Sequence, residues 1–296
     1  MIQKEWGHSM SRKIAVAVIH GIGSQPKNFG DRVCAGIQKR TRALCGEDII
    51  THSVHWAPVL QSVEDEFASK VRLGGKMRLI QLRKYVIDLL GDAVAYQPIP
   101  GSRATYDTIH GVFANTLKNL AAEAGEDAPL CIVSHSLGSV IASNFIYDLQ
   151  TDARRPIISD LVRDQMRNTP LERGETLSLF YTLGSPLALF TLRYDKFGKP
   201  IEMPPPQLHT RYPGLFSEWI NFYDADDVIG FPLRKLSDTY ENTVTEDRQV
   251  NVGRIYEFWN PLSHLRYWTD GAVLDPIAKS LVRVWKEVNA VSPPAV

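Results

Sequence analysis

One stretch near the middle of the chain limits what this sequence can fold into. Residues 130–133, Leu-Cys-Ile-Val, form an apolar run with the character of a buried strand. The run stops at a turn of mostly small residues, 134–138, and a helix-like segment, 139–150, follows without a loop. A strand that passes directly into a helix is the unit from which parallel, helix-covered sheets are built. We therefore expect an α/β fold around this stretch.

The turn itself, Ser-His-Ser-Leu-Gly, has a pattern that carries chemistry. A sharp strand-to-helix turn lifts the side chain at its centre, here Ser136, above the edge of the sheet. The residues two before and two after the centre are crowded against neighbouring backbone, so both must be small. Gly138 meets this need, and Ser134 replaces the usual glycine with another small residue. The pattern predicts a nucleophile elbow with Ser136 as the nucleophile, with a purely structural serine as the alternative.

Strand-like and helix-like segments alternate along the rest of the chain. Residues 14–19 form a continuous apolar run, typical of a strand buried on both faces of a parallel sheet. Further strands are predicted at 48–56, 176–183, 217–224 and 252–259, and helices at 28–45, 106–124 and 275–288. The alternation predicts a single α/β domain over residues 1–296. Its mostly parallel sheet of about six strands begins near residue 14 and is flanked by helices.

Two segments interrupt the alternation, at about 57–105 and about 187–216. The first has apolar residues at helical spacing and a basic flank that includes Arg72, Lys76 and Arg83, and the second is rich in loops. Both leave the sheet at the carboxyl ends of strands, where open α/β sheets bind their ligands. We expect cap-like insertions above the site, the first of them helical. An apolar face with a basic rim can also contact a membrane surface, but such a face more often packs on its own domain.

The composition excludes several functions. The 296 residues carry 33 basic and 33 acidic side chains, so the chain has no basic field for nucleic acid. Cys34, Cys45 and Cys131 lack the spacing of a metal site and are interpreted as free thiols. His52 and His55 lie three apart on a predicted strand, so they point to opposite sides of the sheet and are poor candidates for a shared metal site. We expect neither a metal nor a cofactor.

The sequence has no signal for export or membrane insertion. Residues 1–13 are polar and lack the apolar core of a secretory signal. No apolar run reaches the ~18–20 residues that cross a bilayer. These features predict a cytoplasmic protein.

The loop after the first strand contains a His-Gly pair, His20-Gly21, followed by Ile22-Gly23. A dinucleotide-binding loop would need a third glycine three residues after Gly23, and Pro26 occupies that position. The pair instead resembles the oxyanion loop of lipases and esterases, whose backbone N–H groups point at the substrate. A plain strand-to-helix turn stays open as the alternative.

An acidic turn and a histidine follow two later strands. Asp224, Asp226 and Asp227 end one strand, and His264 follows the next. With Ser136 they occur in the order Ser, Asp, His, which differs from the orders of chymotrypsin and subtilisin. This order, the elbow and the His-Gly loop resemble the α/β-hydrolase superfamily, near its serine lipase and esterase-like members. The chain departs from that pattern at the first residue of the elbow, and we expect it to lack the two N-terminal antiparallel strands of the superfamily.

The resemblance implies a role for each of these residues. Ser136 is a weak nucleophile until a base takes its proton, which a neutral His264 can do near pH 7. A carboxylate then holds the imidazole in the right tautomer. Asp227 is the favoured acid because the turn after it resembles that of related lipases, and Asp226 is the alternative.

The same resemblance places the oxyanion hole at the backbone N–H groups of Leu137 and Ile22. The expected activity is cleavage of a carboxylic ester, small-molecule or lipid-like, through an acyl-enzyme. An acyltransferase or a thioesterase can use the same three side chains. A non-catalytic binding protein can share the fold, because fold alone does not fix function.

Overall fold

Six parallel strands form the centre of the molecule. The computed structural model describes residues 11–23, 25–73, 91–99, 101–252 and 263–290. Its sheet has the strand order β2-β1-β3-β4-β5-β6, and every neighbouring pair is parallel. The strands are β1 (Ile14–Ile19), β2 (Ile49–Val54), β3 (Leu130–His135), β4 (Leu177–Leu183), β5 (Glu218–Asp224) and β6 (Glu246–Val250). The predicted α/β fold with a sheet of about six strands is confirmed.

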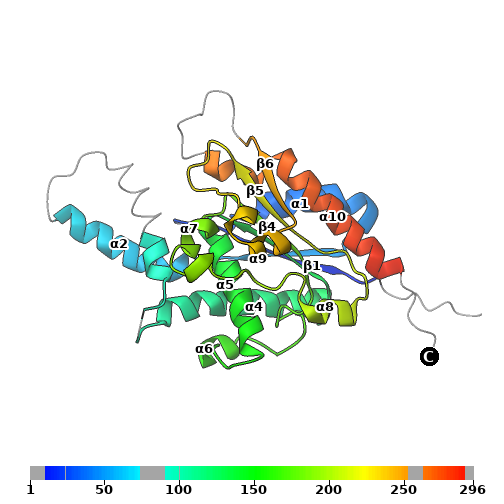
Figure 1. Ribbon diagram of the computed structural model, residues 1–296, viewed down its shortest axis with the longest axis horizontal. Coiled ribbons are helices and arrows are strands. Elements are labelled where there is room, and N and C mark those ends of the chain that lie inside the picture. Colours follow the sequence, from blue (N-terminus) through cyan, green and yellow to red (C-terminus); the bar gives the residue numbers. More distant parts are fainter. Residues whose placement is uncertain (1–10, 24, 74–90, 100, 253–262, 291–296) are drawn as a thin grey trace, which may run out of the picture.

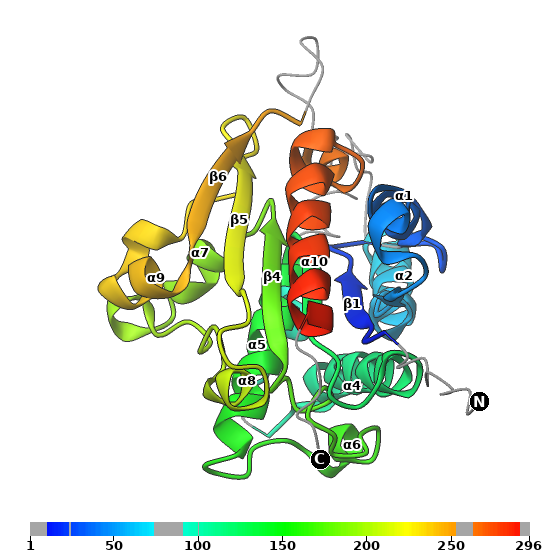
Figure 2. The same cartoon turned by 90° about the vertical axis from the view of Figure 1, so that its right-hand side faces the viewer.

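Helices cover both faces of this sheet (Figure 1, Figure 2). One face carries α1 (Asp31–Cys45) and α10 (Gly271–Ala290), and the other carries α4 (Ala104–Ala124) and α5 (Leu137–Asp152). The predicted helices are thus confirmed, with small shifts of their ends. α1 ends where Gly46 adopts a φ of 57° and donates its N–H to the Arg42 carbonyl at 2.9 Å. A glycine suits this cap because the left-handed region is strained for other residues.

The apolar run of β1 reflects its burial on both faces. Ile14, Val16 and Val18 belong to the core cluster beneath α1 and α10. Ala15, Ala17 and Ile19 belong to the cluster beneath α4 and α5. Successive strand side chains alternate between faces, so a strand covered on both sides must be apolar at every position.

Both interruptions of the α/β pattern contain helices in their described parts. The first begins with α2 (Pro58–Leu73), which extends away from the sheet in Figure 1, and residues 91–96 are again helical. Residues 74–90 of this interruption, which include Lys76 and Arg83 of the predicted basic flank, lie outside the described residues. The second interruption holds α7 (Leu187–Thr191), the helical turn η1 (Asp195–Phe197) and α8 (Pro206–Arg211). None of the helices in the described ranges is long and apolar enough to cross a membrane.

The sixth strand differs from the sequence prediction. β6 is Glu246–Val250, with the sequence Glu-Asp-Arg-Gln-Val, and it pairs with β5 at the edge of the sheet. Only Val250 of this strand is buried, so it has no apolar run. The predicted strand at 252–259 lies outside the described residues except for Val252, which is not in a strand.

The strand order positions a ligand site. From β1 the chain continues to β2 on one side and then crosses to β3 on the other, so the order reverses between β1 and β3. In open α/β sheets, ligands bind at the carboxyl ends of the two strands that flank such a reversal. Here these ends carry His20-Gly21 after β1 and Ser136 after β3.

Candidate active site

Ser136 lies in a strained turn between β3 and α5. Its φ and ψ are 52° and −131°, a conformation that L-residues avoid and that typically costs about 1–3 kcal/mol. The Ser136 N–H donates to the Leu183 carbonyl at 2.9 Å, which ties the turn to the end of β4. Backbone strain of this kind persists where the surroundings hold it in place and is concentrated at functional sites.

Ser134 and Gly138, two residues before and after Ser136, are small for different reasons. A Cβ on Gly138 would lie 2.2 Å from the carbonyl oxygen of His20, so α5 and the His-Gly loop touch through backbone atoms. Ser134 is fully buried, and its hydroxyl donates to the Tyr181 carbonyl at 2.8 Å. The serine that replaces the usual glycine is therefore accommodated by a hydrogen bond to the neighbouring strand.

We expect Gly138→Ala to disable the turn. Because the new methyl group meets backbone rather than a movable side chain, it should destabilise the fold by about 3 kcal/mol. Any activity at Ser136 should fall about 100-fold, since a shift of roughly 1 Å misplaces the reacting groups. Thermal unfolding and kcat/KM measure the two effects. Gly271→Ala is the control, because its Cβ would meet nothing closer than 3.6 Å. A Gly138→Ala protein with unchanged stability would contradict the crowding.

Asp227 and His264 are in contact. His264 Nδ1 lies 2.8 Å from Asp227 Oδ2, and both side chains are almost fully buried. Asp227 also accepts the Ile229 N–H at 3.0 Å and the Tyr267 hydroxyl at 3.0 Å. Burial by itself would raise the pKa of Asp227, but the hydrogen bonds from His264, Ile229 and Tyr267 together with the charge of His264 outweigh it and lower that pKa. Asp227 is therefore a carboxylate at neutral pH.

The other two acids of the turn point elsewhere. Asp224 accepts the backbone N–H groups of Asp226 and Val252, at 2.9 and 2.7 Å, and thereby shapes the turn. Asp226 is exposed to solvent. Of the three candidates, only Asp227 contacts His264.

Two atoms of the site, one on His264 and one on Ser136, have no hydrogen-bond partner among the described residues. With Asp227 ionised, His264 Nδ1 is the donor in this hydrogen bond, and Nε2 is left for a second partner. His264 Nε2 and Ser136 Oγ are both buried and form no hydrogen bond. Gly184 brings the two close, because it directly follows Leu183, which accepts the Ser136 N–H, and a Cβ on it would lie 3.1 Å from His264 Cε1.

Three further side chains hold these groups in place. The sequence pattern places His20 in the oxyanion loop without a role for its side chain, and it gives no role to His135 or Tyr267. His135 Nε2 donates to the His264 carbonyl at 2.5 Å, and the two rings are 4.6 Å apart. His20 stacks on Trp56, accepts the Ala57 N–H on Nε2 and donates from Nδ1 to the Gly21 carbonyl at 2.7 Å. Tyr267 bridges the acidic turn by donating to Asp227 and accepting the Asp224 N–H at 2.8 Å.

Backbone N–H groups are available beside Ser136. Leu137 is the first residue of α5, where helical N–H groups have no partner within the helix and the helix dipole favours negative charge. The loop that carries Ile22 is fixed from two sides. Trp56 Nε1 donates to the His20 carbonyl at 3.0 Å, and the Gly23 N–H donates to the buried carboxylate of Asp92 at 2.7 Å.

Buried histidines predict that acid destabilises the fold. Burial lowers the pKa values of His20, His110 and His135 from 6.5 to about 3. Between pH 6.5 and pH 3 the unfolded chain binds more protons than the folded chain, so stability falls as the pH falls through this window. Each histidine should cost about 2 kcal/mol at pH 5.

Asp148 opposes this effect in part, because burial raises its pKa from 3.8 to about 6 and its protonation favours the folded state. We expect a net loss of several kcal/mol between pH 7.5 and pH 5, measured by urea unfolding at both pH values. Equal stability at the two pH values would contradict the neutral, buried state of the three histidines.

Within the described ranges, no group of His, Cys, Asp or Glu side chains is arranged to hold a metal ion. His52 and His55 have separate partners, Glu123 at 3.0 Å and the Gln25 carbonyl at 2.7 Å.

The hydroxyl of Ser185, another serine at a strand end, is used in hydrogen bonds within the fold. It lies 2.6 Å from Ser139 and accepts the Leu187 N–H.

Comparisons with known proteins give a distant structural likeness. No family model and no curated protein matches the sequence. Among solved structures, the chain is similar to lipase B of Aspergillus fumigatus. The match has 9% sequence identity and a TM-score of 0.35, and it covers 100% of this chain and 69% of the lipase. The function proposed below therefore depends on the side chains of the site.

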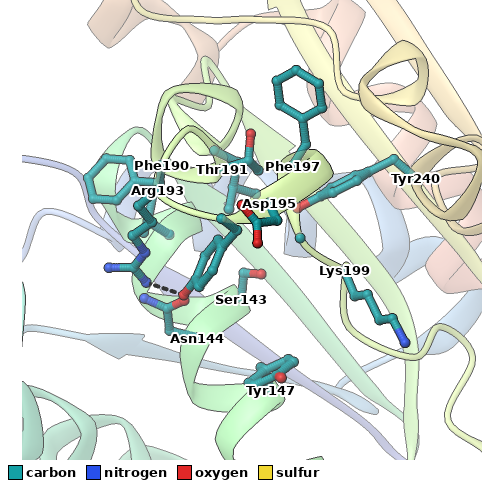
Figure 3. A pocket seen from close by; sticks show the side chains of 14 residues that line it. Ser143, Asn144, Tyr147, Phe190, Thr191, Arg193, Asp195, Phe197, Lys199 and Tyr240 are labelled. Atoms are coloured by element: carbon teal, nitrogen blue, oxygen red, sulfur yellow. Dashed lines mark hydrogen bonds between the residues drawn. The ribbon is translucent and has the colours of Figure 1, made fainter.

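Two cavities are lined by residues of the elements that carry the site, although Ser136, Asp227 and His264 do not line them. One, of about 510 Å³, lies between the loop at Phe29 and the segment at Trp268, close to His135. The other, of about 380 Å³, lies along α5 and α7 (Figure 3). Both volumes fall in the range of roughly 300–1,000 Å³ that is usual for small-molecule sites.

Proposed function

We propose that this chain is a serine hydrolase that cleaves carboxylic esters. One observation carries the proposal: a buried Asp227–His264 hydrogen bond lies beside a strained Ser136, and Ser136 Oγ and His264 Nε2 are left without partners. Buried polar atoms are normally hydrogen-bonded, so two such atoms at one sheet edge favour a site kept ready for a substrate.

The residues support an acyl-enzyme mechanism. Ser136 Oγ attacks the ester carbonyl carbon while its proton passes to His264 Nε2, and Asp227 stabilises the resulting imidazolium. The tetrahedral intermediate then collapses, the bond to the alcohol oxygen breaks, and His264 gives its proton to the leaving alkoxide. Water repeats the sequence on the acyl-enzyme, releasing the acid and restoring Ser136.

Backbone groups would stabilise the intermediate. The N–H groups of Leu137 and Ile22 are assigned to the oxyanion, because Leu137 begins α5 and Ile22 lies in the loop that touches this helix. Each such donor typically contributes about 2.7–4 kcal/mol to transition-state stabilisation. Because the donors are backbone atoms, Leu137→Ala should have a mild effect.

Covalent labelling tests the proposal. A fluorophosphonate should react with the folded protein at a single site, and peptide mass spectrometry should place the adduct on Ser136. The acid-denatured protein is the control, because an unassembled serine is a weak nucleophile. Hydrolysis of p-nitrophenyl esters should be lost in proportion to labelling. A folded protein that neither labels nor hydrolyses these esters would refute the proposal.

A further inference from the structure

The cavity along α5 and α7 begins at Val140, about one helical turn after Ser136, and continues along α5. Val140, Ser143, Asn144 and Tyr147 line it at the spacing of one helical face. At 1.5 Å per residue, Val140 lies about 6 Å and Tyr147 about 16 Å along the helix axis from Ser136. Leu187 lines the opposite wall only three residues after Gly184, which lies against His264. The cavity is therefore placed to hold the part of a substrate that extends beyond its ester.

Polar groups without partners converge in this cavity. Ser143 and Tyr240 are 8% and 4% exposed, yet neither hydroxyl has a hydrogen-bond partner among the described residues. The carboxylate of Asp195, which also lines the cavity, likewise has none there. In Figure 3 the hydroxyl end of Tyr240 and the carboxylate of Asp195 point toward the middle of the cavity, and Ser143 lies on the adjoining helix. Both hydroxyls open onto the cavity, where a bound ligand can supply the partners that the protein does not.

The walls between these groups are aromatic. Tyr147, Phe190, Tyr194 and Phe197 line the cavity together with Tyr240. Flat rings of this kind offer large contact surfaces, and each tyrosine adds a polar end. The rim backbone is strained, since Lys196 and Phe197 have φ angles of 50° and 62°.

Charge and desolvation narrow the choice of ligand. An alkyl chain would bury the Ser143 and Tyr240 hydroxyls and the Asp195 carboxylate without partners, which is costly. A cationic ligand is disfavoured because Arg193 and Lys199, which also line the cavity, would repel it. Arg193 is already engaged by Gln97 and by the Tyr194 hydroxyl, and Lys199 points away from the centre in Figure 3, so neither is placed to hold an anion beside Asp195.

We propose that this cavity binds a neutral ring with several hydroxyl groups, the chemistry of a sugar, as the part of the ester substrate that lies next to the cleaved bond. Ring hydroxyls donate to Asp195 and exchange hydrogen bonds with Ser143 and Tyr240. The ring's C–H face packs on the aromatic walls. The assignment of this ring to a substrate depends on the proposed hydrolase activity, whereas the binding of the ring does not.

A matched pair of esters tests the substrate class. We expect kcat/KM for 6-O-octanoylglucose to exceed that for cyclohexylmethyl octanoate, which has a similar ring without hydroxyls, by at least about tenfold. Asp195→Asn should reduce the ratio of the two values about tenfold or more, because a hydrogen bond to a charged group is lost. Asp164→Asn, an exposed acid outside the cavity, is the control and should leave both values unchanged. A ratio near one, or one unaffected by Asp195→Asn, would overturn the proposal.

Direct binding separates this inference from the hydrolase proposal. Methyl β-glucopyranoside is titrated by calorimetry into the Ser136→Ala protein and into the same protein with Asp195→Asn, Ser143→Ala or Tyr240→Phe. Binding that each added substitution weakens supports the cavity assignment even if neither ester is cleaved, in which case the hydrolase proposal fails. Cleavage of both esters without a preference, combined with no glucoside binding, refutes the cavity assignment and leaves the hydrolase proposal intact.

Discussion

Ser136→Ala is expected to lower kcat for ester hydrolysis about 10⁶-fold, close to the loss of catalysis by the whole triad. The hydroxyl oxygen is the atom that forms the acyl-enzyme bond. The other serine of the turn, Ser134, is fully buried and its hydroxyl donates to the Tyr181 carbonyl. Rates are measured with a p-nitrophenyl ester at substrate concentrations well above KM. An active Ser136→Ala protein would refute the proposed mechanism.

The same substitution should leave the fold intact. Ser136 Oγ has no hydrogen-bond partner, so its removal breaks no interaction of the folded state. Alanine keeps the Cβ, and the strained backbone is unchanged. We therefore expect a melting temperature equal to or slightly above that of the parent protein, as is common when a site is maintained for activity rather than for stability. A large fall in melting temperature would mean that the serine has a structural role.

The strands that the sequence predicted are those whose environment produces a simple pattern. β1 is covered on both faces, so every one of its residues is apolar and the run is visible without a structure. β6 lies at the edge of the sheet and buries only Val250, so Glu-Asp-Arg-Gln gives no strand pattern. Its position is fixed by pairing with β5, which is information that no local window contains.

The elbow was predictable for a similar reason. Ser136 is defined by residues next to it in the chain, namely the strand before it, the helix after it and the small residues that flank it. The support around His264 was not predictable, because it comes from distant segments. His135 and His264 are 129 positions apart, and nothing in either local sequence indicates that they touch.

The choice among the three acids also needed the structure. Asp224, Asp226 and Asp227 share one turn, so sequence spacing ranks them only weakly. Asp224 is used to bind backbone N–H groups, and Asp226 faces solvent, which leaves Asp227 against His264. Because only Asp227 contacts His264, separate substitutions of Asp227 and Asp226 test which of them is the acid.

Asp227→Asn is expected to lower kcat about 10⁴-fold, because the amide cannot stabilise the imidazolium and favours the wrong tautomer of His264. The carboxylate is the ionised partner in this pair, since its pKa is held below its ordinary value by hydrogen bonds that outweigh burial. Asparagine is similar in shape, so the fold should survive even though the hydrogen bonds from Tyr267 and Ile229 weaken. Rates and circular dichroism of the purified protein measure both expectations.

Asp226→Asn is the matched control, since it removes the same charge one residue away without touching His264. Its charge is exposed, so solvent screening should limit the effect on kcat to about twofold or less. The ratio between the two variants isolates the hydrogen bond to His264 from the general negative charge of the turn. Equal losses in both variants would mean that the turn acts through its field alone, and a loss confined to Asp226→Asn would reassign the acid.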